Sequence, residues 1–138
     1  MGVFKAFKTC EKVEREGVTI DYGDGDWVKI ARAGGSNQGF KNLIERYARK
    51  YKKQIQLDAM PEGEMKEILY RAYAEHVILD FCVKNPETGK PFPVNPESCM
   101  EMFRLLPDFF ADIKNQADNL ALFREEIDAE SAKNSERS

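Results

Sequence analysis

The stretch from Pro107 to Phe123 places the strongest constraint on how this chain folds. Apolar residues recur through it at alternating steps of four and three, which puts them on one face of a helix. That face comprises Leu106, Phe110, Ile113, Ala117 and Leu120. Phe109, Leu122 and Phe123 lie outside it, so the helix is apolar on more sides than one wall of a small core requires. The pattern predicts either a central core helix or an apolar surface that contacts another protein.

Length and composition are those of one globular domain. A folded chain of 138 residues buries roughly 65–70% of its extended surface. The apolar content of 42% and the charged content of 33% argue against disorder throughout. The net charge of −3 gives no general attraction to nucleic acid or an anionic membrane, and we find no segment long and apolar enough to span a bilayer. The three cysteines include no C-x-x-C pair, which favours reduced thiols in a cytosolic protein.

We divide the chain into three parts: an N-terminal segment of open structure (residues 1–16), one globular and mostly helical domain (17–124), and a charged C-terminal tail (125–138). The domain begins with the residue alternation of a β-hairpin. Its strands are expected over residues 18–22 and 27–32, with a Gly- and Asp-rich turn between them. Two strands alone are marginally stable, so this hairpin must pack against helices.

Four helices are expected after the hairpin. They begin near residue 37, at Pro61, after Asn95 and at Pro107. We expect the first to run to Gln54, capped by Ser36 or Asn37, and the second to continue into the apolar run Val77–Val83. The last can extend to about Ala132. The predicted fold class is mainly α (α+β), with an N-terminal β-hairpin packed on a bundle of about four helices.

Signatures of catalysis or metal binding are weak. Residues 34–39 have the glycine spacing of a phosphate-binding loop, but Phe40 and Lys41 stand where Lys and then Ser or Thr are needed. The aspartates near the hairpin turn lack the spacing of a calcium loop. His76 is the only histidine, so the sequence offers few of the ligands from which zinc sites are usually formed. We therefore expect no enzyme activity, no catalytic residue, no metal site and no cofactor.

A basic cluster provides the alternative to a purely protein-binding role. Lys41 and Lys52 belong to it, and the four cations most suited to gripping phosphates are Arg46, Arg49, Lys50 and Lys53. Tyr47 and Tyr51 are interleaved and could stack on bases. A solvated helix face explains the same cations, because the helix dipole favours them near the C-terminal end. The chain as a whole is acidic, so nucleic-acid binding through residues 41–53 is kept as the alternative.

Several short motifs follow one another in a specific order. They are Trp27–Ile30, Gly34-Gly35-x-Asn37 with Phe40, Ala72–Leu79, Leu106-Pro107-Asp108, and Asn119–Arg124 with Lys133-Asn134 behind it. In this order the chain resembles the tail assembly chaperones of bacteriophages with long, non-contractile tails. The resemblance covers about residues 18–135 and rests on the succession of motifs, since no single one carries chemistry.

The resemblance implies a small, mostly helical protein of the infected or lysogenic host's cytoplasm. Such proteins bind the tape measure protein, keep its apolar helices soluble, and help recruit the major tail protein as the tube grows. They are absent from the mature virion and have no catalytic residues. Many are also made as a longer product by programmed frameshifting, and residues 132–134 permit codons that contain a slippery heptamer.

A chaperone for apolar helices needs exposed apolar surface of its own, to which a client helix can bind. We expect Phe109, Leu120, Leu122 and Phe123 to contact the partner, whereas Phe110 and Ile113 belong to the core. The same exposed surface would favour self-association, so a homo-oligomer is also expected as a possible state. The charged tail would keep the protein soluble.

Overall fold

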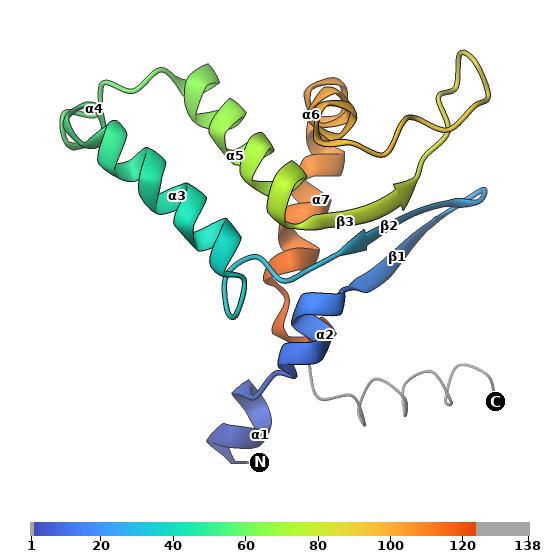
Figure 1. Ribbon diagram of the computed structural model, residues 1–138, viewed down its shortest axis with the longest axis horizontal. Helices are drawn as coiled ribbons and strands as arrows, with labels where there is room; N and C mark the ends of the chain where they lie inside the picture. Colours follow the sequence, from blue (N-terminus) through green and yellow to red (C-terminus); the bar gives the residue numbers. More distant parts are fainter. Residues whose placement is uncertain (1, 124–138) are drawn as a thin grey trace.

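The computed structural model describes residues 2–123, and the side chains of residues 120 and 121 are not included in that description (Figure 1). Three expectations therefore fall outside the described residues. They concern the charged tail over residues 125–138, the extension of the last helix to Ala132, and the frameshift at residues 132–134.

A three-stranded antiparallel sheet is formed by β1 (Val18–Gly23), β2 (Asp26–Ile30) and β3 (Ile78–Cys82), in the order β1-β2-β3. The predicted hairpin of β1 and β2 is confirmed. Val18 pairs with Ile30 and Ile20 with Val28, and the connecting residues Asp24 and Gly25 both have positive φ. Glycine adopts this backbone conformation without the clash that a Cβ would create, which explains the glycine-rich turn.

The third strand corrects the expectation for Val77–Val83. The helix predicted from Pro61 is α5 (Glu62–His76), which ends before this run, and Ile78–Cys82 pairs with β2. Val28 and Phe81 face each other in that pairing, and both are buried. A short apolar run is compatible with either a helix or a buried strand, and the free edge of β2 decides in favour of the strand. The side-chain amide of Asn37 donates to the carbonyl of His76 at 2.7 Å, which satisfies one of the last carbonyls of α5.

The helix expected from residue 37 to Gln54 is divided in two. Its parts are α3 (Gln38–Lys50) and α4 (Lys52–Gln56), and Tyr51 between them departs from helical geometry, with φ −107° and ψ 21°. Asn37 is the capping residue, since its side chain accepts a hydrogen bond from the backbone N–H of Phe40 at 3.1 Å.

The C-terminal helices are α6 (Pro96–Leu105) and α7 (Pro107–Asp118). The predicted cap of α6 is confirmed, because the Asn95 side chain accepts from the backbone N–H of Ser98 at 2.8 Å. The prediction of one helix from Pro107 to Phe123 is wrong in its second half. Asn119 is extended, and the chain then makes a single 3-10 turn, η1 (Leu120–Phe123).

The N-terminal segment left open by the sequence forms two short helices, α1 (Val3–Phe7) and α2 (Glu11–Glu16). No residue of α1 is buried. The second helix packs against η1, and the backbone N–H of Cys10 donates to the carbonyl of Phe123 at 2.8 Å. The beginning and the end of the described chain therefore lie side by side, at the lower end of the sheet in Figure 1.

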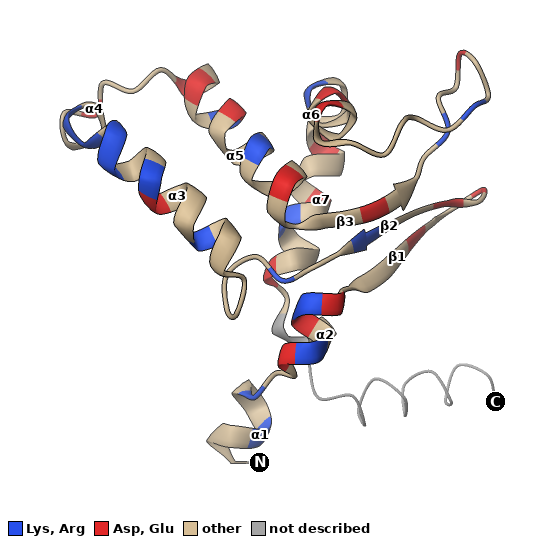
Figure 2. Cartoon of the chain, in the orientation of Figure 1, with Lys and Arg blue, Asp and Glu red and all other residues tan. Residues whose placement is uncertain are grey.

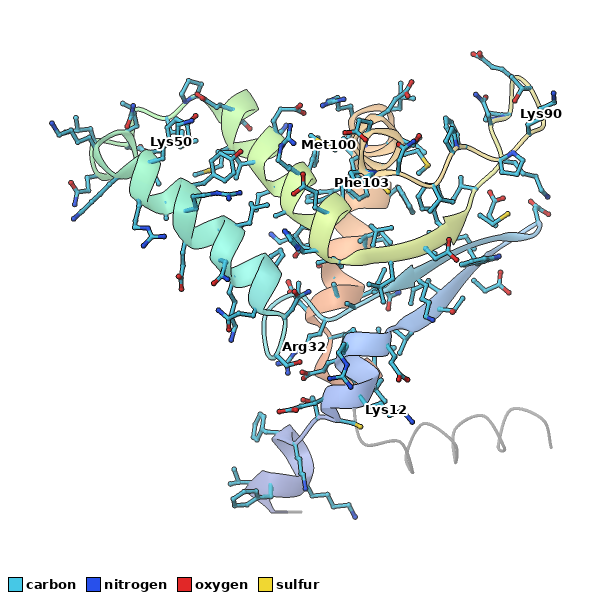
Figure 3. The ribbon with its side chains drawn as sticks, in the orientation of Figure 1. Lys12, Arg32, Lys50, Lys90, Met100 and Phe103 are labelled. Atoms are coloured by element: carbon cyan, nitrogen blue, oxygen red, sulfur yellow. The ribbon has the colours of Figure 1, made fainter. Side chains whose placement is uncertain are left out.

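The core lies between one face of the sheet and the helices α5, α6 and α7. Four aromatic rings form its centre, with edge-on and tilted contacts between centroids 4.7–5.7 Å apart; they are Tyr70, Tyr73, Phe103 and Phe110. Phe103 and Ile113 are completely buried, and Figure 3 shows Phe103 and Met100 between α5 and α6. The expected fold class, mostly helical with a β-hairpin packed on helices, is confirmed, with β3 as an added strand.

Candidate partner-binding site

The end of α7 and the turn η1 were expected to face a partner, and the structure does not leave this surface free. Phe123 is 0% exposed and belongs to the core, so the expectation that it is accessible is wrong. Leu122 is half-buried against the same core. Phe109 is half-buried too, with its ring 5.6 Å from that of Tyr22 and 5.8 Å from that of Phe103. The side chain of Leu120 lies outside the described residues.

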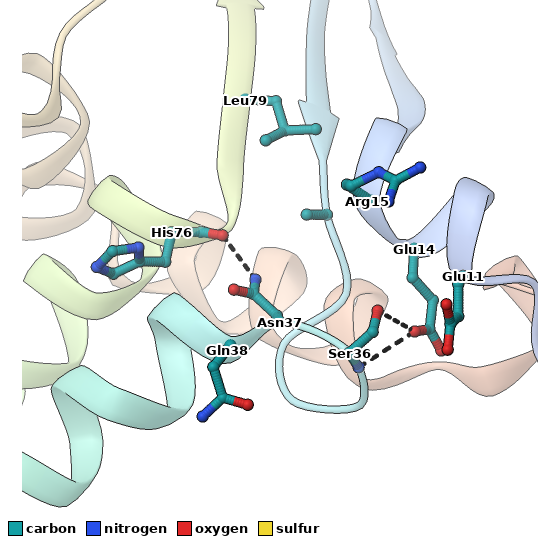
Figure 4. A pocket seen from close by; sticks show the side chains of 9 residues that line it. Glu11, Glu14, Arg15, Ser36, Asn37, Gln38, His76 and Leu79 are labelled. Carbon is teal, nitrogen blue, oxygen red and sulfur yellow. Dashed lines mark hydrogen bonds between the residues drawn. The ribbon is translucent and has the colours of Figure 1, made fainter.

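The helix that covers η1 is held in place by a buried carboxylate. Glu14 accepts hydrogen bonds from the guanidinium of Arg32, from the hydroxyl of Thr9, and from both the hydroxyl and the backbone N–H of Ser36. Figure 4 shows the two bonds from Ser36. The carboxylate is only 3% exposed, yet its charge is matched by Arg32 and its oxygens by donors. We call these four residues the Glu14 cluster.

The charged form of Glu14 is strongly favoured. Burial by itself raises the pKa of this carboxyl, but the hydrogen bonds from Ser36, Thr9 and Arg32 outweigh it and lower the pKa to about 2. A cavity of about 420 Å³ lies beside the cluster and is lined in part by Glu11, Arg15, Gln38 and His76 (Figure 4). Because both oxygens of the Glu14 carboxylate accept hydrogen bonds within the fold, its role is to tie α2 to the loop between β2 and α3.

A different apolar surface is open. A groove of about 180 Å³ runs between α3, α4 and α5, and apolar and aromatic side chains form its walls. We call it the α3–α5 groove. It is lined by Ile44, Tyr47, Ala48, Ile55, Met60, Met65, Ile68 and Leu69. Ile55 and Met65 are each 44% exposed, and Leu57 just beyond the groove is 76% exposed. These values are high for large apolar side chains that gather in one place.

The groove exists because α3 is covered on one side only. This helix lies at the outer edge of the molecule next to α5 (Figure 1), and Leu43 is its single fully buried residue. Phe40, near its start, packs edge-on against Tyr73 of the core, with 5.3 Å between the ring centroids. Toward the other end of α3, the apolar residues Ile44 and Tyr47 line the groove together with residues of α4 and α5.

The two helices on one side of the groove, α3 and α4, carry many exposed cations. Figure 2 shows the Lys and Arg residues along these two helices. The guanidinium carbon of Arg46 is 5.8 Å from the ring centroid of Tyr47, and the Lys50 ammonium is 5.4 Å from that of Tyr51. The two rings are stacked, with 6.2 Å between centroids and 6° between planes. The predicted patch of Arg46, Arg49, Lys50 and Lys53 is thus exposed on one side of the molecule, with Lys53 on α4 rather than α3.

Sequence reasoning missed this groove because its residues have the spacing of a core. Their spacing predicts that Ile44 and Tyr47 face inward from the helix beginning near residue 37, and that Met65 and Ile68 belong to the buried stripe of the next helix. The signal that could have revealed it is the connection between the helices. Ile55, Leu57 and Met60 place three large apolar side chains in a short segment where polar residues are usual.

Other kinds of site were searched over residues 2–123. No group of three or more His, Cys, Asp or Glu side chains within this range could hold a metal ion. Likewise, no helix in the described part of the chain is long and apolar enough to cross a membrane. The three cysteines are free thiols, and burial raises the pKa of Cys99 to about 12.

Comparison with known proteins gives one match. No curated protein and no solved structure matches the chain. The family model described as YdaY prophage protein matches residues 35–134, which is more than half of the sequence. The matched part contains α3 to α7, and therefore every residue that lines the α3–α5 groove. This chain belongs to the YdaY prophage protein family.

Proposed function

We propose that this phage-family protein is a tail assembly chaperone that binds amphipathic helices of the tape measure protein in the α3–α5 groove. The groove is the observation that carries the proposal, because its walls gather eight apolar and aromatic side chains, with Ile55 and Met65 exposed. Membership of a prophage family supports the phage context. The resemblance of the ordered motifs to tail assembly chaperones supports the specific role.

The size and shape of the groove favour a helix over a small molecule. Its volume of about 180 Å³ is below the roughly 300–1,000 Å³ of typical small-molecule sites. A groove between helices suits the other mode of recognition, in which a client helix inserts a few side chains spaced three and four residues apart. The role we propose is binding without catalysis and without a cofactor.

The remaining parts of the proposal follow from the same resemblance. The protein would help recruit the major tail protein during tube assembly in the cytoplasm of the infected or lysogenic host, and would be absent from the mature virion. Exposed apolar residues also provide a surface for homo-oligomer formation, which analytical ultracentrifugation at several concentrations would measure.

Co-expression with the candidate tape measure protein tests the chaperone role. We expect the client to be soluble with the wild-type chain and insoluble with Ile55→Asp/Met65→Asp, which puts two charges into the groove. The matched control is Val94→Asp/Leu105→Asp, at exposed apolar residues away from the groove, and it should keep the client soluble. Client solubility that is independent of this chain would refute the chaperone role. Dependence on the chain but equal loss in both variants would refute only the assignment to the groove.

Nucleic-acid binding remains the second candidate, because one observation favours it. Within residues 2–123, no carboxylate lies within ion-pair distance of Arg46, Arg49, Lys50 or Lys53. Such cations are available for phosphates, and binding would then weaken steeply with salt. Filter binding of DNA and RNA at increasing salt concentrations measures this directly. Absence of salt-dependent retention would eliminate the candidate.

A further inference from the structure

The two sides of the α3–α5 groove carry opposite charges. On the α3–α4 side, Arg46 stands beside Tyr47 of the groove wall, and Lys50 stands beside Tyr51, whose ring stacks on that of Tyr47. Arg49, Lys52 and Lys53 of the same two helices are exposed. Glu45 is the only acidic residue of these two helices. A binding partner on this side therefore meets a strongly positive surface, although the chain as a whole has a net charge of −3.

The α5 side begins with the acidic residues Glu62, Glu64 and Glu67, and one of them is already in an ion pair. Hydrogen bonding to the Glu64 carboxylate raises the pKa of Tyr51. Glu67 forms a two-pronged ion pair with Arg104 of α6, on the other side of α5. The cations of α3 and α4, by contrast, have no carboxylate partner in the described part of the chain. Within the described residues, the α3–α4 side of the groove therefore presents an excess of unpaired cations, whereas the α5 side begins with the carboxylates Glu62 and Glu64.

The side chains between these charges select against a polynucleotide. Tyr47 and Tyr51 stack on one another, so part of the ring faces that bases would need is already used. The groove floor consists of Ile44, Ile68 and Leu69, which offer nothing to phosphate oxygens. An apolar floor with a cationic border matches an apolar helix face bordered by carboxylates.

We propose that the α3–α5 groove selects amphipathic helices whose apolar stripe is flanked by Asp or Glu on the side that faces α3 and α4. This inference rests on the proposed function, since it specifies which client helices the groove accepts. Arg46 and Lys50 determine this selectivity, and the apolar floor supplies affinity that does not depend on charge. A long helical client would then be bound at its acidic amphipathic segments and passed over at basic ones.

Two designed helical peptides test the proposal on the full-length protein. They share one apolar stripe and differ only in flanking residues, Glu in one and Lys in the other. We expect the Glu-flanked peptide to bind roughly fivefold more tightly at low salt, the sum of several exposed ion pairs. The difference should shrink in 0.5 M salt, because the Debye length is then only about 4 Å and exposed ion pairs are strongly screened. Fluorescence anisotropy measures both affinities.

Charge reversal assigns the preference to the groove. Lys50→Glu should lower the affinity for the Glu-flanked peptide and raise the affinity for the Lys-flanked one. Lys90→Glu, the same change in an exposed loop, should alter neither affinity. Figure 3 shows that Lys50 and Lys90 lie at opposite ends of the molecule. Circular dichroism of both variants confirms that the fold is retained.

The outcomes separate the two proposals. Equal affinities for the two peptides, or equal effects of Lys50→Glu and Lys90→Glu, would overturn the selectivity and leave helix binding intact. If neither peptide binds while the client remains soluble only with this chain, the groove assignment fails and the chaperone role survives. Tight binding of single-stranded DNA or RNA that competes with the Glu-flanked peptide and is lost in Lys50→Glu would replace the inference with a nucleic-acid site.

Discussion

The turn η1 and the α3–α5 groove are both built from large apolar side chains, and only one of them is covered. At η1, helix α2 lies over the chain, Cys10 donates to the carbonyl of Phe123, and the Phe123 side chain is 0% exposed. At the groove, Ile55 and Met65 remain 44% exposed, and α3 lies at the outer edge of the described part of the chain (Figure 1). The two surfaces differ in what the rest of the chain supplies, not in their own composition.

The two surfaces also differ in the polar interactions that hold their neighbouring helices in place. Helix α2, which covers η1, is joined to its neighbours by backbone hydrogen bonds from Cys10 to Phe123 and from Arg32 to Glu14. The Glu14 cluster adds a buried carboxylate whose two oxygens both accept hydrogen bonds. No comparable set of bonds closes the outer end of α3, where the described cations have no carboxylate partner. One apolar surface is therefore part of the fold, and the other is available for binding.

The largest expected effect is at η1. Phe123→Ala removes a completely buried ring and should lower the free energy of unfolding by about 3–5 kcal/mol. Phe4→Ala, at a ring that is 84% exposed, should change it by about 0.5 kcal/mol or less. Urea denaturation measures both. If Phe123→Ala lowers the free energy of unfolding by less than about 1 kcal/mol, η1 is not covered and becomes a candidate partner-binding surface again.

The Glu14 cluster should account for the next largest effect. Glu14→Gln leaves Arg32 without its partner and should cost roughly 2–3 kcal/mol at pH 7. The folded-state pKa of Glu14 is about 2, below its usual 4.5, so its contribution is present above pH 4.5 and is lost as the pH falls toward 2. Unfolding measured between pH 7 and pH 3 should therefore show a shallower pH dependence in Glu14→Gln. Glu11→Gln, an exposed position on the same helix, should follow the wild-type curve.

A smaller effect is expected where α3 joins the core. The Asn37 side chain caps α3 and also donates to the carbonyls of Arg32 and His76. Asn37→Ala should lower stability by about 1–2 kcal/mol. Asn42→Ala on the same helix removes only an exposed bond with Gln38 and should be close to neutral. Hydrogen exchange should show faster opening of α3 in Asn37→Ala, and unchanged exchange would show that α3 is anchored elsewhere.

The smallest stability effect should be in the groove. Ile55→Asp/Met65→Asp changes two partly exposed side chains and should cost about 1 kcal/mol or less. The same variant is expected to abolish client binding, so a loss of binding here would not be caused by a loss of stability. At η1 the two effects cannot be distinguished, since any large change there also destabilises the core. A loss of several kcal/mol in the groove variant would instead make α3 an ordinary core helix.

Much of the fold could be predicted from the sequence, because local signals specify it. Strand alternation and the Asp24-Gly25 turn predicted the hairpin, and Asn95 before Pro96 predicted the start of α6. The strand β3 could not be predicted this way. Ile78–Cys82 has no signal of its own that distinguishes strand from helix, and its conformation depends on the edge that β2 offers from far along the sequence.

The candidate site depended on the same kind of long-range information. Apolar spacing correctly placed Ile113 in the core, but it predicted a partner-facing Phe123 and an inward-facing Ile44. Phe123 is covered by α2, whereas no other helix of residues 2–123 covers the outer side of α3 (Figure 1). No pattern within α7 or α3 contains that information, so burial of Phe123 and opening at Ile44 became visible only in three dimensions.

The pairing of β2 with β3 also sets the order in which the chain can fold as it is synthesised. The hairpin of β1 and β2 closes over a tight turn, whereas β3 is made only after α3, α4 and α5. Bringing distant segments together is entropically costlier and slower than closing a turn. During that interval the backbone groups on one edge of β2 have no partner, and such an edge pairs readily with other chains. Nascent copies on neighbouring ribosomes are therefore at risk of joining through β2 until α5 and β3 emerge.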